Sequence, residues 1–332
     1  MKIFKKTSGP DLSAIDHMAR SHRLKPLELL PWLIIPACYF LFPNYLVLGT
    51  QVMIMVIFCL SLDLIMGYAG IVTLGHSAFF GIGAYTAGLL AVHGWHEPFS
   101  GLVVAGLAAG IVGIATGYVI LRTHGLTLLM LTLAVVFMLS EIANKAVSIT
   151  GGTDGLQGVT IDPVAGLFRF DMFGRTGYFY AAAILFLTWL LVRVLVHSPF
   201  GRSLTGIREN VLRMHAIGAP VHRRLVTAYA LGATLAGVAG AVMAHSTQFV
   251  GLNSISFDLS GAVLIMLILG GVGRLYGAFL GAPIYMIAQD MLSRLDPTYW
   301  FFWVGLMLVV VVMYAQGGIL GIIDSVMRRV RR

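Results

Sequence analysis

Long apolar stretches separated by short polar ones recur along almost the whole chain. A helix that crosses the hydrocarbon core of a bilayer needs about 20 mostly apolar residues, and on that rule the sequence contains about ten candidate spans. They lie near Leu29–Phe42, Tyr45–Met66, Gly75–Val92, Leu102–Leu121, Leu126–Val147, Tyr178–Val196, Leu225–His245, Leu259–Leu269, Leu275–Leu292 and Tyr299–Ala315. The first and eighth are short enough to be tilted, interrupted or partly re-entrant. The pattern predicts an all-α fold, a polytopic bundle of transmembrane helices.

Sixteen of the 22 lysine and arginine residues lie in four places outside these stretches: both tails, one long connection and one short connection. They are Lys2, Lys5, Lys6, Arg20, Arg23 and Lys25; Arg202, Arg208, Arg213, Arg223 and Arg224; Arg328, Arg329, Arg331 and Arg332; and Arg122. Connections rich in lysine and arginine stay on the cytoplasmic side of a membrane. With ten spans all four places fall on one side, so we expect both termini to be cytoplasmic.

This topology divides the chain into a membrane domain and two tails. Residues 1–28 form a cytoplasmic amino tail, 29–316 the transmembrane domain and 317–332 a basic cytoplasmic tail. Within the membrane domain, 148–177 are expected to be periplasmic and 197–224 cytoplasmic. Because the first apolar stretch follows a long polar tail, we expect no cleavable signal peptide.

The composition agrees with a membrane protein and excludes most soluble classes. Hydrophobic residues make up 58% of the 332 and charged residues 11%, whereas soluble domains carry about 25% charged residues. The basic residues behind the net charge of +8 lie mostly in the tails and connections, so we interpret the charge as a topology signal and expect no nucleic-acid partner. Cys38 and Cys59 lie in apolar stretches, which favours small buried hydrophobic side chains.

No pattern typical of an enzyme or of a metal site is present. The sequence contains no G-x-S-x-G, no H-E-x-x-H, no histidine pair at metal-ligand spacing and no G-x-x-x-x-G-K-[ST]. We therefore predict no catalytic residue, no metal ligand and no cofactor bound by this chain. If transport needs ATP, another polypeptide must bind it.

Polar and glycine residues interrupt the apolar pattern between Asp63 and Tyr85. Glycines at 67, 70, 75, 81 and 83 surround Thr73, His76 and Ser77. Irregular backbone at membrane depth persists only where protein buries it or where it lines a water-filled cavity. One interpretation is a broken or re-entrant segment beside a solute path, with Asp63, Thr73, His76 and Ser77 as path residues. The other is a short cytoplasmic turn followed by an ordinary helix.

Glu141 and Lys145 are four residues apart near the outer end of the fifth stretch. On a helix they face each other, which predicts an ion pair. Glu141 and Asn144 are candidates for the outward vestibule, since ionisable groups within membranes are costly and are often functional. A pair satisfied at the interface, with Lys145 reaching toward the headgroups, is the alternative.

A glycine-rich loop follows at Thr150–Gly158. Glycines permit a tight, hydrogen-bonded turn, and we place Thr150, Gly151, Gly152 and Asp154 at the periplasmic mouth. The loop either contacts a protein that delivers solute or is a structural turn.

The connection Ser198–Arg224 has the pattern of a short amphipathic helix. Leu204, Ile207, Val211 and Met214 recur at helical intervals, and Gly218 with Pro220 ends the pattern. Such a helix lies on anionic lipid or docks into a groove of another protein, and the pattern favours neither.

A further glycine-rich region, Leu269–Tyr285, has a sequence similar to the region around Gly81. An internal duplication and a chance match both explain the similarity.

Several short motifs occur together in one order along the chain. They are Gly67-Tyr-Ala-Gly70, Leu74-Gly-His76, Phe79-Phe-Gly-Ile-Gly-Ala-Tyr85, Thr150-Gly-Gly152 with Asp154-Gly155, Gly201-Arg202 with Ile207-Arg-Glu209, and Leu269-Gly-Gly-Val-Gly273. In this order and spacing the chain resembles the LivM-type permease subunits of branched-chain amino-acid ABC importers. The resemblance extends from Leu46 to Tyr314.

The resemblance implies a set of partners in the inner membrane of a bacterium. They are a second, LivH-type permease, two cytoplasmic ATPase subunits that bind the ATP, a periplasmic solute-binding protein and the surrounding lipid bilayer. Branched-chain amino acids are the default cargo, although similar permeases serve urea, amides and other small carboxylates.

The same resemblance makes 197–224 the coupling segment that sits in a cleft of an ATPase subunit. The residues implied in this contact are Arg202, Ile207, Arg208, Glu209, Arg213 and Gly218. The Glu-Ala-Ala of related coupling loops is replaced here by Leu212-Arg-Met214, and Thr73 stands where relatives often carry serine.

An ion-coupled secondary transporter of a small solute is the competing interpretation. Asp63, Glu141, Asp258 and Asp290 would then be proton or cation sites. Against it, the sequence shows no inverted repeat with paired broken helices.

Overall fold

The computed structural model describes residues 30–163, 174–314 and 318–321, and in these ranges the regular structure is helical. The expected tails, 1–28 and 317–332, lie outside the described residues, apart from the single turn at 318–321. The helices are α2 (Leu30–Leu41), η2 (Pro43–Tyr45), α3 (Leu46–Asp63), η3 (Leu64–Tyr68), α4 (Ser77–Val92), α5 (Pro98–Ile120), α6 (Leu126–Lys145), α7 (Val147–Thr150), η4 (Gly152–Asp154), α8 (Arg175–His197), α9 (Pro199–Glu209), α10 (Val211–Ala216), α11 (Val221–Thr247), η5 (Leu252–Ile255), α12 (Phe257–Gly270), α13 (Gly277–Leu295) and α14 (Trp300–Tyr314).

The predicted apolar stretches and the observed helices coincide, which confirms the all-α bundle. Within the described residues, five of these helices are long and apolar enough to cross a membrane: Pro43–Tyr68, Pro98–Ile120, Leu126–Lys145, Arg175–His197 and Val221–Thr247. Shorter apolar helices include α4 and α12. The count of ten spans and the side on which the termini lie stay predictions.

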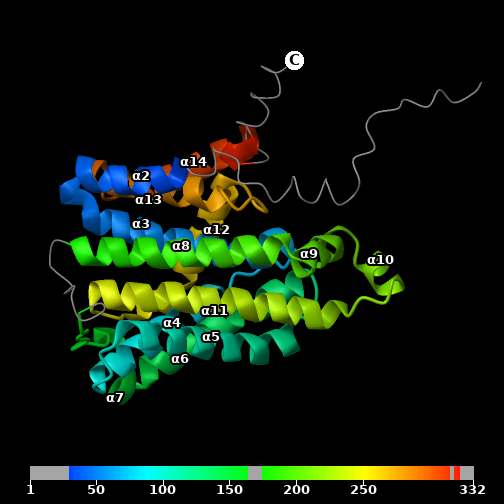
Figure 1. The fold of residues 1–332 in the computed structure, drawn as a ribbon, viewed down its shortest axis with the longest axis horizontal. Coiled ribbons are helices and arrows are strands. Elements are labelled where there is room, and N and C mark those ends of the chain that lie inside the picture. The colour runs from blue at the N-terminus through cyan, green and yellow to red at the C-terminus, as the bar shows by residue number, and fades with distance from the viewer. Residues whose placement is uncertain (1–29, 164–173, 315–317, 322–332) are drawn as a thin grey trace, which may run out of the picture.

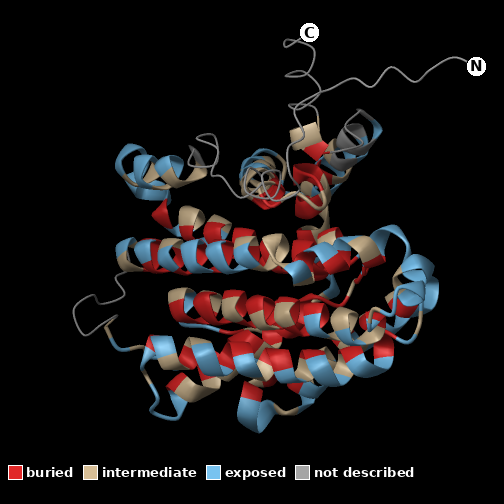
Figure 2. Ribbon diagram, turned by 45° about the vertical axis from the view of Figure 1, so that its right-hand side comes forward, coloured by how far each residue is buried: buried red, intermediate tan, exposed pale blue. Residues whose placement is uncertain are grey.

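The long helices run side by side along the longest axis of the molecule (Figure 1). At one end of this axis lie α9 and α10, and at the other lies α7. By the predicted topology these are the cytoplasmic and the periplasmic end. Figure 2 shows buried positions on the inward faces and exposed positions on the outward faces of the helices. Many of the exposed side chains are large and apolar, such as Ile111 and Phe137, as lipid contact requires.

Helix α11 is the central element of the bundle. In its most apolar stretch 72% of residues are buried, against 17% in α6. Small residues let its neighbours approach: a β-carbon on Gly240 would overlap the Phe80 backbone in α4, and one on Gly237 would lie 2.5 Å from the β-carbon of Ala109 in α5. Small residues therefore serve close helix packing here.

Two connections depart from regular structure at the α9 end. Helix α3 ends in one π-helical turn, η3, and residues 69–76 are irregular before α4 begins. The α12–α13 connection contains Gly271 and Gly273, both with positive φ. The turn at 318–321 returns to this connection, where Gly318 approaches the backbone of Gly271.

The segment Ser198–Arg224 contains two helices rather than the one that we expected. Asn210 is extended (φ −158°, ψ 101°), and its side chain accepts a 2.9 Å hydrogen bond from the Arg213 amide, which caps α10. The cap interrupts the apolar face: Leu204 and Ile207 on α9 are buried, whereas Val211 on α10 is 43% exposed. Asparagine is among the strongest N-cap residues, and this competing preference ended the predicted helix early.

Candidate functional site

The irregular segment 69–76 lies inside the protein. Thr73 and His76 are 1% and 0% exposed, and Ser77, at the first turn of α4, is fully buried. This burial is what irregular backbone at membrane depth requires. The depth of the segment in the bilayer stays a prediction.

His76 is held by α3 at one edge and on one face of its ring. Its Nε2 atom lies 2.7 Å from the Ser61 hydroxyl, and its ring stacks on Phe58 with centroids 5.2 Å apart. The Ser61 hydroxyl donates to the Phe58 carbonyl at 2.6 Å, so it accepts from the Nε2–H of a neutral His76. The Nδ1 atom is buried and has no partner among the described residues.

Thr73 and Ser77 connect the irregular segment to three further helices. The Thr73 hydroxyl is hydrogen-bonded to Tyr229 of α11. Next to it, Thr132 of α6 accepts from the Leu74 amide at 3.3 Å. Ser260 of α12 accepts from the Ser77 amide at 2.9 Å and donates to the Ser77 hydroxyl at 2.7 Å. One polar cluster thus joins α3, α6, α11 and α12 through the start of α4.

Asp63 belongs to a second group of contacts, nearer the α9 end. It is 1% exposed, and its Oδ1 accepts a 2.7 Å hydrogen bond from the Gly273 amide in the α12–α13 connection. Arg208 of α9 donates to the carbonyl oxygen of Gly67 in η3. Its positive charge also attracts the Asp63 carboxylate.

Glu141 and Asn144 lie apart from these clusters. Glu141 forms the predicted ion pair with Lys145 at 3.2 Å, and both side chains are more than half exposed. Asn144 is in the last turn of α6, and its carbonyl lies beside Gly152 of the glycine-rich loop. The six residues proposed for a translocation path therefore do not form one group in this conformation, and their role in transport stays a prediction.

The glycine-rich loop is a tight, hydrogen-bonded turn, as predicted. The Thr150 hydroxyl donates to the Ala143 carbonyl at 2.5 Å and accepts from the Gly152 amide at 3.3 Å. Gly151 and Gly152 have positive φ. Leu156 pairs with Val250 across an antiparallel bridge. Asp154 is exposed at the surface of the turn.

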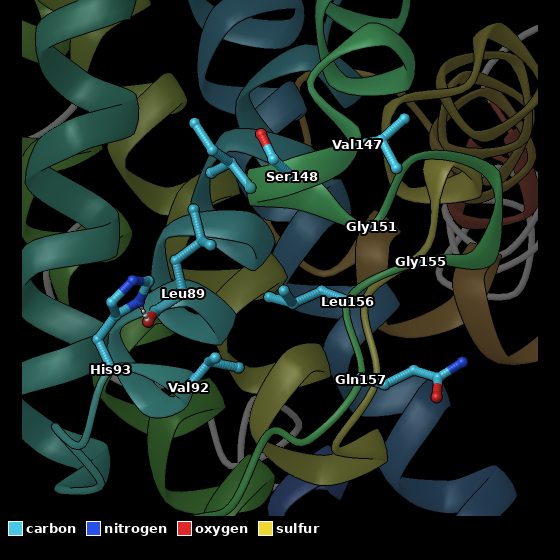
Figure 3. Close-up of a pocket in the computed structure, with 10 residues that line it drawn as sticks. Leu89, Val92, His93, Val147, Ser148, Gly151, Gly155, Leu156 and Gln157 are labelled. Carbon is cyan, nitrogen blue, oxygen red and sulfur yellow. Dashed lines mark hydrogen bonds between the residues drawn. The ribbon is translucent and has the colours of Figure 1, made fainter.

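A cleft of about 490 Å³ lies beside this turn. Its lining comes from the end of α4, from α7 and from the loop that follows: Leu89, Val92, His93, Val147, Ser148, Ile149, Gly151, Gly155, Leu156 and Gln157. Figure 3 shows the side chains of His93 and Val92 on one wall and Leu156 and Gln157 on the other. The cleft is at the predicted periplasmic mouth.

The expected coupling residues lie at the opposite end. Arg202, Arg208, Glu209 and Arg213 are exposed, whereas Ile207 is buried against the bundle. Gly218 has φ +80° and ends the α10 segment. Leu212 and Ile217 add large exposed apolar side chains, 81% and 71% exposed.

Sequence reasoning missed Ser61, Thr132, Tyr229 and Ser260. Each is a single hydroxyl residue in an apolar stretch, and its partner lies on another element. A hydroxyl residue in a membrane helix indicates that a hydrogen bond forms, but the sequence does not identify the residue with which it forms. Among the described residues, no group of three His, Cys, Asp or Glu side chains could hold a metal ion.

Comparison with known proteins relates most of the chain to transport permeases. The family described as "Branched-chain amino acid transport system / permease component" matches residues 44–315. The permease protein LivM of the high-affinity branched-chain amino acid transport system of Escherichia coli K12 is 27% identical over 95% of this chain and 80% of its own length. A probable LivM of Methanocaldococcus jannaschii is 28% identical over 58% of this chain and 56% of its own.

A sugar transporter subunit also matches part of the chain. The ribose import permease RbsC of Bacillus subtilis is 33% identical over 40% of this chain and 45% of its own length. No solved structure matches the chain.

Proposed function

The chain belongs to the branched-chain amino-acid transport permease family, and on this basis we propose that it is the membrane-spanning subunit of an ABC importer. It moves a branched-chain amino acid, or a similar small polar solute, into the cytoplasm, and ATP hydrolysis on partner subunits drives the movement. The observation that carries the proposal is the family match over 44–315, together with a LivM relative that aligns with 95% of the chain.

The proposed assembly contains this chain, a LivH-type second permease, two cytoplasmic ATPase subunits and a periplasmic solute-binding protein, in a bacterial inner membrane. The chain itself performs no covalent chemistry and binds no cofactor. The loop at Thr150–Gly158 and its cleft face the solute-binding protein. The Asp63, Thr73, His76 and Ser77 region forms part of the solute path in another conformation, when the buried contacts open.

The exposed tip formed by α10 supports docking to an ATPase subunit. Leu212 in α10 and Ile217 directly after it are large, exposed apolar residues with Arg213 beside Leu212, and α10 lies at one end of the molecule (Figure 1). Exposed apolar groups at a water-facing end mark an interaction site, and we propose that an ATPase subunit occupies this one. In this chain Leu212-Arg-Met214 takes the place of the usual Glu-Ala-Ala, so we propose that an apolar contact replaces it.

We propose no ion coupling, because three of the four candidate acids have partners within the chain. Asp63 accepts from Gly273, Glu141 pairs with Lys145 and Asp290 pairs with Arg294. Asp258 lies in the first turn of α12, where the helix dipole favours a negative charge.

The test is purification of the chain from native membranes in mild detergent, followed by reconstitution of what accompanies it. We expect ATPase subunits and a second permease to co-purify, and leucine to enter proteoliposomes only with ATP and the solute-binding protein. Uptake of ribose in place of leucine would show that the transported solute is a sugar and not an amino acid. A homo-oligomer without ATPase, whose uptake follows an ion gradient, would overturn the proposal.

A separate substitution tests the proposed contact between α10 and an ATPase subunit. We expect Leu212→Asn to reduce co-purified ATPase by about tenfold or more, as loss of an interface hot spot does, while leaving the fold intact. Leu295→Asn is the matched control, since Leu295 ends α13 and is 79% exposed. Equal ATPase recovery from both variants would rule out the apolar contact.

A further inference from the structure

Arg208 contacts two connections that are far apart in sequence. Its Nη1 donates to the Gly67 carbonyl in η3. The same nitrogen lies close to Gly273, because a β-carbon built there would be 2.9 Å from it. Its aliphatic stem covers Gly70, where a β-carbon would lie 3.0 Å from Cγ. One side chain of α9 thus reaches the α3–α4 connection and the α12–α13 connection together.

The two connections are also tied to each other. The Asp63 carboxylate accepts from the Gly273 amide, and the Tyr68 hydroxyl is hydrogen-bonded to the Leu275 backbone. At Gly67 any side chain would overlap Asp63 Oδ1 and the Gly273 backbone. Gly273 adopts φ +76°. Glycine is needed at both places for the connections to touch.

The charges explain why an arginine stands here. The carbonyls at the end of a helix lack partners within it and carry partial negative charge. Asp63 adds a carboxylate at the end of α3, where that charge is unfavourable, and it is buried. Removing one partner of a buried charge is strongly destabilising. A guanidinium that binds the Gly67 carbonyl and attracts Asp63 compensates both groups.

The remainder of α9 joins this contact to the proposed ATPase surface. Leu204 and Ile207 are buried, so α9 is held to the bundle, while α10 projects from it. Apolar packing is not directional and tolerates sliding, whereas charge-assisted hydrogen bonds fix geometry.

We propose that Arg208, with Asp63 and Gly273, is the link that transmits displacement of α9–α10 to the α3–α4 and α12–α13 connections, so that both move as one unit. This inference rests on the proposed function, since the displacement is supplied by ATPase subunits. Arg208 is a positioning residue: it touches no solute, and it acts by coupling the ATPase contact to the connections beside the polar cluster of His76 and Ser77.

The test compares Arg208→Gln with Arg208→Lys and with Arg223→Gln in the assembled importer in proteoliposomes. Arg223 is an exposed cytoplasmic-end arginine on the first turn of α11. The readout is the ratio of solute taken up to ATP hydrolysed. We expect Arg208→Gln to lower this ratio by about fivefold or more, the range of a typical coupling free energy. The ratio for Arg208→Lys should lie between that of Arg208→Gln and that of the unmodified complex, because lysine keeps the positive charge but lacks the planar set of donors of a guanidinium.

Hydrogen–deuterium exchange of peptides 64–76 and 267–277 gives the second readout. On ATP binding, exchange should change in both peptides together in the unmodified complex, and in neither in Arg208→Gln. A ratio in Arg208→Gln equal to that of Arg223→Gln would overturn the proposal. Failure of both Arg208 variants to assemble would also overturn it, because the contact would then only hold the fold.

Failure of the proposed function is distinguishable from failure of this link. An unmodified complex that shows no ATP-driven uptake would refute the function alone. In the purified full chain, Arg208→Gln should still raise exchange in 267–277 over the Arg223→Gln control, and equal exchange would refute the contact alone.

Discussion

The Nε2 atom of His76 lies 2.7 Å from the hydroxyl of Ser61, and this contact fastens the irregular segment before α4 to the body of α3. Phe58 stacks on the same imidazole one turn earlier. The hydrogen bond at the ring edge and the stacked face together attach the residue before α4 to α3.

Replacing His76 by alanine should destabilise the chain by roughly 2–4 kcal/mol, since it leaves a cavity beside Phe58 and an unpaired Ser61 hydroxyl. Thermal unfolding in detergent measures the change, and uptake in proteoliposomes should fall while the complex still assembles. His124→Ala, at an exposed loop position, is the control. If His76→Ala lowers only the amount of protein and leaves specific uptake normal, His76 is a packing residue and not part of the solute path.

Replacing Gly67 by alanine should destabilise the chain by roughly 1–3 kcal/mol, because the new methyl group overlaps the Asp63 carboxylate and the Gly273 backbone. Denaturant unfolding in mixed micelles measures it. Gly261→Ala is the matched control: it lies within α12 with open space around its β-carbon position, so alanine there should be neutral or stabilising by up to about 1 kcal/mol. Equal stability of the two variants would show that the connections do not touch as described.

Substitutions at Gly218 test a requirement for backbone conformation alone, because the space around this residue is open. Nothing lies within 4 Å of its β-carbon position, but φ is +80°. Valine should therefore strain the backbone by about 1–2 kcal/mol, whereas asparagine tolerates this conformation. We expect Gly218→Val to reduce uptake per ATP and Gly218→Asn to preserve it, both with normal membrane insertion. Normal coupling in the valine variant would remove the conformational requirement at the end of α10.

Thr150→Val should loosen the glycine-rich turn beside the periplasmic cleft, because the Gly152 amide loses its acceptor at a cost of about 1–3 kcal/mol. Hydrogen–deuterium exchange across residues 147–158 should rise. Thr153→Val, at an exposed neighbouring position, serves as its control and should leave exchange unchanged. Identical exchange in the two variants would contradict the role of the Thr150 hydroxyl.

The helices could be predicted from the sequence because a membrane helix is a local property. Twenty apolar residues in a row satisfy their own backbone hydrogen bonds in lipid, whatever surrounds them. The Glu141–Lys145 pair, four residues apart on α6, followed from helix geometry alone. The tight turn at Thr150–Gly158 followed from its glycines. The resemblance to LivM-type permeases rested on motif order, and the family match confirmed it.

The break at Asn210 shows where local signals compete. Apolar periodicity through Val211 and Met214 favoured one continuous helix, and the capping side chain of Asn210 divided it in two. Capping stabilises a helix start by about 1 kcal/mol. At an exposed connection this exceeds the stabilisation from an apolar helix face, because that face has no core to pack against.

What the sequence by itself determined is the membrane class, the helical segments and the family, since each depends on composition, spacing or motif order. Only the tertiary structure decided which polar groups meet. Asp63 and Gly273 are 210 residues apart, and Ser77 and Ser260 are 183 apart. A lone hydroxyl or carboxylate in an apolar stretch must find a partner in the protein interior, but the way the helices pack selects that partner.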